Sequence, residues 1–175
     1  MSQTASPALA ASPIGAASLM ILAGIAFAGV NVATQALTYQ MGFPAASAAF
    51  WQYFIALVFS LPIVFNLGLK ALATRHPFLH ILRVGLSAAG VQAFALSFAQ
   101  GVPVWQVIAL VMTSPFFIVA GAAIFLHERV TLWRLGATLG GFTGAMIILQ
   151  PWSASFTLAA LLPVAAAAFW GGASL

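Results

Sequence analysis

The side chains of this chain that could take part in chemistry are few, and most of them are neutral. The sequence holds one acidic residue, Glu128, against five Lys and Arg residues and three histidines, and it has no cysteine. One carboxylate excludes paired-carboxylate acid–base catalysis and multi-carboxylate metal sites within this chain, and the missing cysteines exclude thiol chemistry. The residue types therefore predict that the chain is not an enzyme and carries no cofactor.

Two of the histidines, His76 and His80, are four residues apart, and His127 is expected on the same side of the protein. Histidines at this spacing on a helix can bind zinc. Pro77 interrupts the pair, however, and no carboxylate ligand lies nearby in the sequence. We interpret the histidines as residues of the membrane interface and predict no metal site.

Neutral polar side chains inside apolar segments are better candidates for recognition. Asn31 and Gln35 are four residues apart and would share one face of a helix. Thr113 and Ser114 precede Pro115, which removes a helical hydrogen-bond donor and leaves a carbonyl free. Buried polar groups are costly in lipid unless they find partners, so these side chains should face inward. There they form interhelical hydrogen bonds or line a substrate path, and we expect at least two to line the path.

Aromatic side chains accompany several of these polar residues. Trp51, Tyr53 and Trp170 could stack on a planar or cationic substrate. Trp105 and Trp152 lie near the ends of apolar segments and are interpreted as interfacial anchors. The predicted substrate-binding residues are Asn31, Gln35, Trp51, Gln52, Gln92, Thr113, Ser114 and Trp170.

The elements that position these residues are long apolar segments. Apolar residues make up 63 % of the chain and charged residues 3 %, whereas a soluble domain carries about a quarter charged residues. Only lipid suits such a surface, and about 20 apolar residues span its hydrocarbon core as a helix. We therefore predict an all-α, polytopic membrane helix bundle. The expected spanning helices cover residues 14–37, 45–67, 78–98, 103–126, 132–149 and 156–175.

The cations fall at alternate joints between these helices. Lys70, Arg75 and Arg83 flank the second joint, and Arg129 and Arg134 flank the fourth, while the other joints carry no charge. Short joints make neighbouring helices antiparallel, so all five cations lie on one side, which the positive-inside rule assigns to the cytoplasm. The sequence thus predicts a multi-pass protein of a bacterial inner membrane with a cytoplasmic N-terminus.

The fourth joint and the fifth helix carry residues with predicted structural roles. Glu128 could serve as a gate or a proton site, but its place at the interface favours an ion pair or a hydrogen-bond acceptor that fixes the turn. Thr131 is the expected N-cap of the fifth helix. Three glycines that recur every four residues would let a neighbouring backbone approach closely. The predicted structural residues are Pro115, Glu128, Arg129, Thr131, Gly136, Gly140 and Gly144.

The first and sixth expected helices resemble each other, with AFAGVN at 26–31 and AFWGGA at 168–173. If the sixth helix restarts the pattern of the first, the repeating unit has five helices. An odd number of helices inverts the second copy in the membrane. Inverted repeats are a signature of secondary transporters, whose substrate site lies at the repeat interface near the midplane.

A run of motifs from the fourth helix onward is the most specific feature of the sequence. Ser114-Pro115 is followed by HERVT at 127–131, by GGFTG at 140–144 and by Gln150-Pro151. This run resembles the EamA domain, which defines a branch of the drug/metabolite transporter superfamily. The resemblance covers about residues 14–175. The chain departs from the family pattern at Gln52 and Gln35, near which the family often has basic residues, so charge-based recognition at these two positions is not expected.

The resemblance implies a protein of two EamA repeats and ten helices. This chain would then comprise a disordered cytoplasmic tail (1–13), a first repeat of five transmembrane helices (14–151) and the first helix of an inverted second repeat (152–175). The predicted function is secondary transport of amino-acid-like, nucleoside-like or drug-like solutes by alternating access. The partners would be the substrate, the lipid bilayer and a missing second repeat or another copy of the protein, with no nucleic acid. The alternative is a non-transporting membrane scaffold or assembly partner with the same helix bundle.

Overall fold

The computed structural model of the chain describes residues 13–67, 76–125, 127, 131–150, 152–153 and 156–175. The chain divides into two units, Met1–Ala33 and Thr34–Leu175. Some of the predictions fall outside the described residues. They are those for the tail over residues 1–12 and for Lys70, Arg75, Glu128, Arg129 and Pro151.

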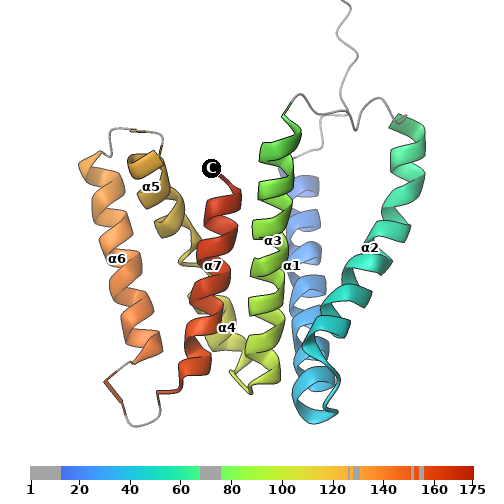
Figure 1. Cartoon of the computed structure of the whole chain (residues 1–175), viewed down its shortest axis with the longest axis horizontal. Coiled ribbons are helices and arrows are strands. Elements are labelled where there is room, and N and C mark those ends of the chain that lie inside the picture. Colours follow the sequence, from blue (N-terminus) through green and yellow to red (C-terminus); the bar gives the residue numbers. More distant parts are fainter. Residues whose placement is uncertain (1–12, 68–75, 126, 128–130, 151, 154–155) are drawn as a thin grey trace, which may run out of the picture. The chain divides into compact units, whose positions relative to one another are not determined.

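Every regular element among the described residues is helical, which confirms the predicted all-α membrane bundle. The first unit holds most of α1 (Pro13–Gln35), a single long apolar helix. The second unit continues with η1 (Ala36–Gln40), α2 (Ala45–Leu67), α3 (Pro77–Ala99), α4 (Val104–Val111), α5 (Ser114–Phe125), α6 (Leu132–Leu149), η3 (Leu158–Leu161) and α7 (Leu162–Ala173) (Figure 1).

Five segments of the described chain are long and apolar enough to cross a membrane, and they match the first five predicted helices. The last apolar helix, Leu158–Ala173, is shorter. It opens with the 3-10 turn η3, and Ser174 caps its end. A sixth spanning helix over 156–175 therefore remains a prediction.

The fourth span is broken into α4 and α5 at Met112 and Thr113. Pro115 has no backbone N–H to donate and its ring crowds the preceding turn, so regular α-helical hydrogen bonding cannot pass this point. Thr113 compensates locally, because its N–H (3.1 Å) and its hydroxyl (2.6 Å) both donate to the carbonyl of Leu110. The result is a discontinuous helix whose break lies within a membrane-spanning segment.

The start of α6 has the N-cap that the sequence predicts. The side-chain oxygen of Thr131 accepts a hydrogen bond of 3.4 Å from the backbone N–H of Arg134. The glycines at 136, 140 and 144 have no neighbour within 4 Å of an added Cβ among the described residues. The close-packed partner expected for this glycine face is therefore not in the described part of the chain, and that partner remains a prediction.

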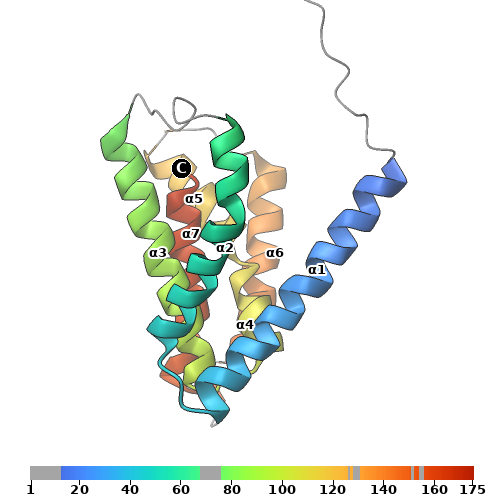
Figure 2. The same cartoon turned by 90° about the vertical axis from the view of Figure 1, so that its right-hand side faces the viewer.

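In the second unit, α7 packs along α3 on one side and α5 on the other (Figure 1). Figure 2 shows α3 and α7 side by side again in the perpendicular view. Small residues allow this approach, since Ala166, Ala167 and Gly171 on α7 are buried. Alternation of the helices brings the starts of α3 and α6 to the same end of the unit (Figure 1).

The contact between α7 and α5 depends on Gly171. A Cβ added at this position would lie 2.7 Å from Cβ of Phe117 and 3.2 Å from the carbonyl oxygen of Ser114. A backbone carbonyl cannot move aside without distorting α5, and Ser114 lies directly after the break of the fourth span. Gly171 therefore sets how closely α7 can approach the broken helix.

Gly171→Ala is predicted to lower the melting temperature of the full-length protein, because the added methyl group would push α5 and α7 apart. Overpacking of this kind costs about 1–3 kcal/mol. Thermal unfolding in detergent, followed by fluorescence-detected size-exclusion chromatography, measures the change. Gly172→Ala is the matched control, because its added methyl group would meet nothing closer than Leu86 at 3.7 Å. Equal melting temperatures for the two variants would contradict this packing.

Candidate functional site

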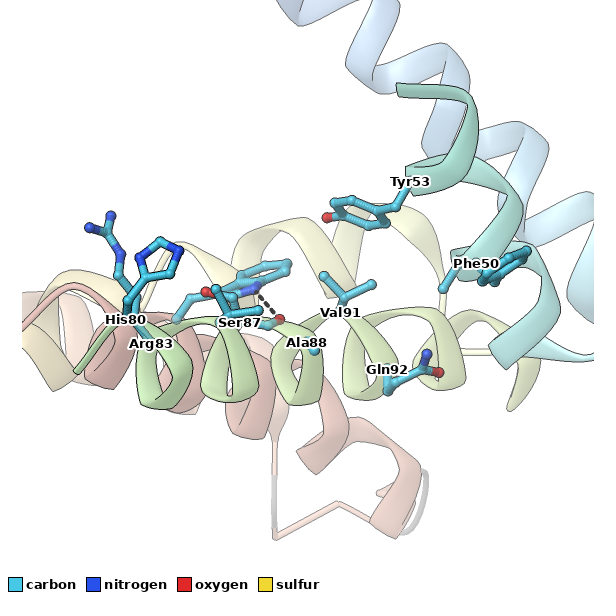
Figure 3. A pocket seen from close by; sticks show the side chains of 11 residues that line it. Phe50, Tyr53, His80, Arg83, Ser87, Ala88, Val91 and Gln92 are labelled. Atoms are coloured by element: carbon cyan, nitrogen blue, oxygen red, sulfur yellow. Dashed lines mark hydrogen bonds between the residues drawn. The ribbon is translucent and has the colours of Figure 1, made fainter. Parts of the chain in front are cut away.

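A cavity of about 490 Å³ lies between α2, α3 and α7 in the second unit (Figure 3). Its volume falls within the range of about 300–1,000 Å³ that is typical of small-molecule sites. Mostly apolar and aromatic walls with a few polar groups are also typical of such sites. This cavity, called the aromatic pocket here, is lined by Ala49, Phe50, Tyr53, His80, Arg83, Val84, Ser87, Ala88, Val91, Gln92 and Trp170.

Trp170 is the aromatic side chain of the pocket that is fixed by the packing of α7 on α3. Its indole Nε1 donates a hydrogen bond of 3.3 Å to the carbonyl of Ser87, and its ring centroid lies 5.5 Å from that of Phe94. Gly90 makes room for the indole, because a Cβ at this position would lie 2.6 Å from Nε1. Trp170 therefore presents a positioned aromatic surface to the pocket.

The opposite wall of the aromatic pocket comes from α2. Phe50 and Tyr53 lie three residues apart and so share one face of the helix. Phe50 stacks on Phe54 at a centroid distance of 5.8 Å and an interplanar angle of 16°. Phe50 and Tyr53 are 60 % and 53 % exposed, so this side of the pocket is not closed by the described residues. A planar solute could enter here and lie between rings of α2 and α7.

The polar groups of the aromatic pocket line up along α3. His80, Arg83 and Ser87 follow one another at three- and four-residue spacing, which places them on one helix face. Gln92 lines the pocket farther along the same helix, and Figure 3 shows His80 and Arg83 beside each other at the other end. The pocket thus combines a cationic end, an aromatic middle and an amide.

Two of the predicted substrate-binding residues, Gln92 and Trp170, meet in the aromatic pocket. Gln35 instead links two segments of the second unit, because its Nε2 donates a 2.8 Å hydrogen bond to the carbonyl of Val102. Asn31 lies in the first unit, where its side chain is buried and its Nδ2 has no partner among the described residues. A role in substrate binding stays a prediction for all four residues.

The remaining predicted substrate-binding residues do not line the aromatic pocket. Trp51 is half exposed and packs edge-on against Phe50 and Phe54. Gln52 is exposed on α2. Thr113 and Ser114 belong to the break of the fourth span, where the hydroxyl of Thr113 donates a hydrogen bond to the carbonyl of Leu110. Substrate contact by these four residues also remains a prediction.

Sequence reasoning did not select Phe50, His80, Arg83 or Ser87 as site residues, although all four line the aromatic pocket. A signal for the α3 residues exists, since three polar side chains on one face of an otherwise apolar helix predict a polar stripe. The sequence assigned His80 and Arg83 to the membrane interface instead. Only the packing of α2 and α7 against that stripe reveals that it borders a cavity.

A second cavity, of about 360 Å³, lies at the opposite end of α3 from Arg83. Gln100, Gln106 and Gln150 contribute amides to its lining, and Nε2 of Gln106 reaches the carbonyl of Ile148 at 3.5 Å. Three amides suit a hydrated, hydrogen-bonding space. The aromatic pocket is the better candidate for binding a ring, because rings wall it on two helices.

Gly90→Ala is predicted to displace the indole of Trp170 and to shrink the aromatic pocket, because the methyl group would overlap the ring. In a variant whose other tryptophans are replaced by Phe, the change should raise acrylamide quenching of Trp170 fluorescence and shift its emission maximum. Gly85→Ala, on the same helix with nothing within 4 Å of its added Cβ, serves as the control. Identical spectra for the two variants would contradict the role of Gly90.

Comparison with known proteins identifies relatives along most of the chain. A protein 59 % identical over 156 residues is named riboflavin transporter, from Rhizobium johnstonii, and the match covers 89 % of this chain and 51 % of the relative. A riboflavin transporter of Vibrio cholerae is 47 % identical over 164 residues, covering 93 % of this chain and 55 % of the relative. An S-adenosylmethionine uptake transporter of Rickettsia bellii is 34 % identical over 110 residues, covering 62 % of this chain and 37 % of the relative.

The chain spans about half the length of the riboflavin transporters that it matches. No solved structure matches it. The model of the EamA-like transporter family matches residues 14–150, the part that the sequence motifs single out. This family consists of transporters and not of enzymes, in agreement with the residue types. The chain therefore belongs to the EamA-like transporter family.

Proposed function

We propose that this chain is part of a secondary transporter that carries riboflavin across a bacterial inner membrane. The aromatic pocket is the observation that carries the proposal. Riboflavin consists of a planar three-ring system and a neutral polyhydroxyl chain. A pocket with rings on two helices suits the planar part, because aromatic stacking contributes about 1–3 kcal/mol per ring contact. The relatives named riboflavin transporters support the same choice of substrate.

Individual residues of the pocket can be given roles in this function. Trp170 would stack on one face of the ring system, and Phe50 and Tyr53 would meet it from α2. Gln92 offers both a donor and an acceptor to the polar edge of the ring. Gln92 is exposed on α3, so its amide is accessible to a ligand.

The mechanism that we propose is alternating access between two five-helix repeats of opposite orientation. The half-exposed rings of α2 mark the side on which a second repeat, or another copy of the protein, would close the pocket. The break between α4 and α5 supports this mechanism, because transporter sites are typically built beside discontinuous helices. In the proposed orientation the cationic ends of α3 and α6 and the N-terminus face the cytoplasm.

S-adenosylmethionine is the rival substrate suggested by the more distant relatives. Its sulfonium group is a cation, which an aromatic pocket could bind. Arg83 lines this pocket, however, and would repel a sulfonium placed beside it. A neutral flavin ring meets no such repulsion, although the carboxylate of S-adenosylmethionine can pair with an arginine.

Trp170→Ala is predicted to weaken riboflavin transport by the full-length protein. Loss of one stacking contact of about 1–3 kcal/mol corresponds to a rise in KM of about 5- to 150-fold. Uptake of radiolabelled riboflavin into proteoliposomes measures it, with Trp170→Phe expected to retain intermediate activity. Trp133→Ala is the control, because Trp133 is 90 % exposed on α6 and lies outside the aromatic pocket.

Two results would contradict the proposed function. One is that the wild-type protein moves no more riboflavin than protein-free liposomes do. The other is that Trp170→Ala and Trp133→Ala transport riboflavin equally well. Transport of S-adenosylmethionine in place of riboflavin would select the rival substrate.

A further inference from the structure

Arg83 lies beyond the first turn of a candidate membrane-spanning helix, and its side chain is exposed among the described residues. It is six residues beyond Pro77, the first residue of α3, and so about 9 Å along the helix axis. The segment Pro77–Ala99 is one of the candidate membrane spans. The other cation among the described residues, Arg134, lies only two residues beyond the start of α6. Arg83 is therefore the cation that enters its span farthest in the described part of the chain.

Charges within membrane segments are costly and often mark functional sites. The side chain of Arg83 lines both the aromatic pocket and a neighbouring cavity of about 370 Å³. A ligand in either cavity would therefore lie beside this guanidinium.

His80 adds a second nitrogen donor beside Arg83. The two residues are three positions apart on α3, and both line both cavities. Figure 3 shows the imidazole and the guanidinium extending next to each other on the side of α3 that Tyr53 faces. A planar carboxylate would be satisfied by the arginine fork alone. A phosphate has three terminal oxygens, so it can use the fork and the histidine together.

We propose that His80 and Arg83 form a phosphate-binding site at one end of the aromatic pocket. The aromatic rings lie in the same cavity, so the ligand class that fits the whole site is an aromatic solute with a phosphate on its side chain. Flavin mononucleotide, the 5′-phosphate of riboflavin, belongs to this class, and when bound it would exclude riboflavin from the pocket. The choice of a flavin rests on the proposed function, whereas the phosphate site does not. The phosphate of a lipid headgroup has the same chemistry.

The first experiment compares two flavins on the full-length protein in dodecyl maltoside, a detergent without phosphate. Quenching of flavin fluorescence gives the dissociation constants of riboflavin and flavin mononucleotide. We expect the wild-type protein to bind the phosphorylated flavin at least fivefold more tightly. In Arg83→Gln that ratio should fall to about one, and Arg83→Lys should keep part of it, because lysine retains the charge but not the fork.

Two controls accompany this comparison. Arg134→Gln removes a cation outside the aromatic pocket and should leave the ratio of dissociation constants unchanged. Inorganic phosphate should compete with flavin mononucleotide on the wild-type protein and on Arg134→Gln, but not on Arg83→Gln. If the phosphorylated flavin had the same advantage in Arg83→Gln as in the wild type, free phosphorylated solutes would not bind through Arg83.

The second experiment tests the lipid source of the phosphate. The protein is placed in nanodiscs that contain phosphatidylglycerol, extracted mildly, and examined by native mass spectrometry for retained lipid. Retention that depends on Arg83, together with weaker flavin mononucleotide binding than in maltoside, assigns the site to a headgroup. Flavin mononucleotide selectivity that depends on Arg83 in both environments assigns it to the free solute.

The phosphate site is overturned if neither flavin selectivity nor lipid retention changes in Arg83→Gln. This result is distinguishable from failure of the proposed function. Riboflavin transport that continues while Arg83 has no effect on any phosphate refutes only the phosphate site. The reverse result is also possible. If the protein binds no riboflavin, but inorganic phosphate competes with phosphatidylglycerol in a way that depends on Arg83, only the proposed substrate is refuted.

Discussion

The approach of α7 to α3 is the contact on which the rest of the second unit depends. It is possible because Gly90 presents no side chain where the indole of Trp170 lies, and because Gly171 presents none toward Phe117 on the far side. In a membrane, helices gain little from burying apolar surface against each other, so close van der Waals packing at small residues holds them together. The same two glycines therefore determine both how α7 is seated and where the ring of Trp170 points.

The broken fourth span follows from a second constraint of the membrane, the need to satisfy backbone polar groups without water. Pro115 prevents a regular helix at this point, and Thr113 satisfies the carbonyl of Leu110 twice, from its backbone and from its hydroxyl. The break lies next to Gly171, since the carbonyl of Ser114 approaches that glycine. Packing of α7 and interruption of the fourth span thus meet at one place in the second unit.

Because the chain has few charged residues, each ionisable side chain has a large effect on the local electrostatics. In a soluble protein an arginine beside a histidine on a helix would be an ordinary solvated surface. Within an apolar span the same pair costs more free energy unless a ligand, a headgroup or water accepts its hydrogen bonds. His80 and Arg83 both line the aromatic pocket, whereas Arg134 does not.

Much of the fold could be predicted from the sequence because the membrane imposes a simple rule on composition. Long apolar segments must be helices there, which determined the class of the fold and the first five spans, and the run from Ser114-Pro115 to Pro151 indicated the family. The sixth spanning helix stays a prediction, because the described apolar helix covers Leu158–Ala173. The glycines of α6 were expected to pack closely because their spacing permits it, but spacing does not specify a partner.

The site itself was decided by tertiary structure. Helical spacing places Asn31 and Gln35 on one helix, yet Gln35 is engaged by the carbonyl of Val102, a residue far away in the sequence. Conversely, Phe50, Arg83 and Trp170 have no sequence relation that predicts a shared cavity. The sequence by itself determined that this protein is a helical membrane bundle of a transporter family, because hydropathy and local motifs are properties of single segments. Which side chains share the pocket was decided only by the packing of α2, α3 and α7, because a cavity is a property of several helices at once.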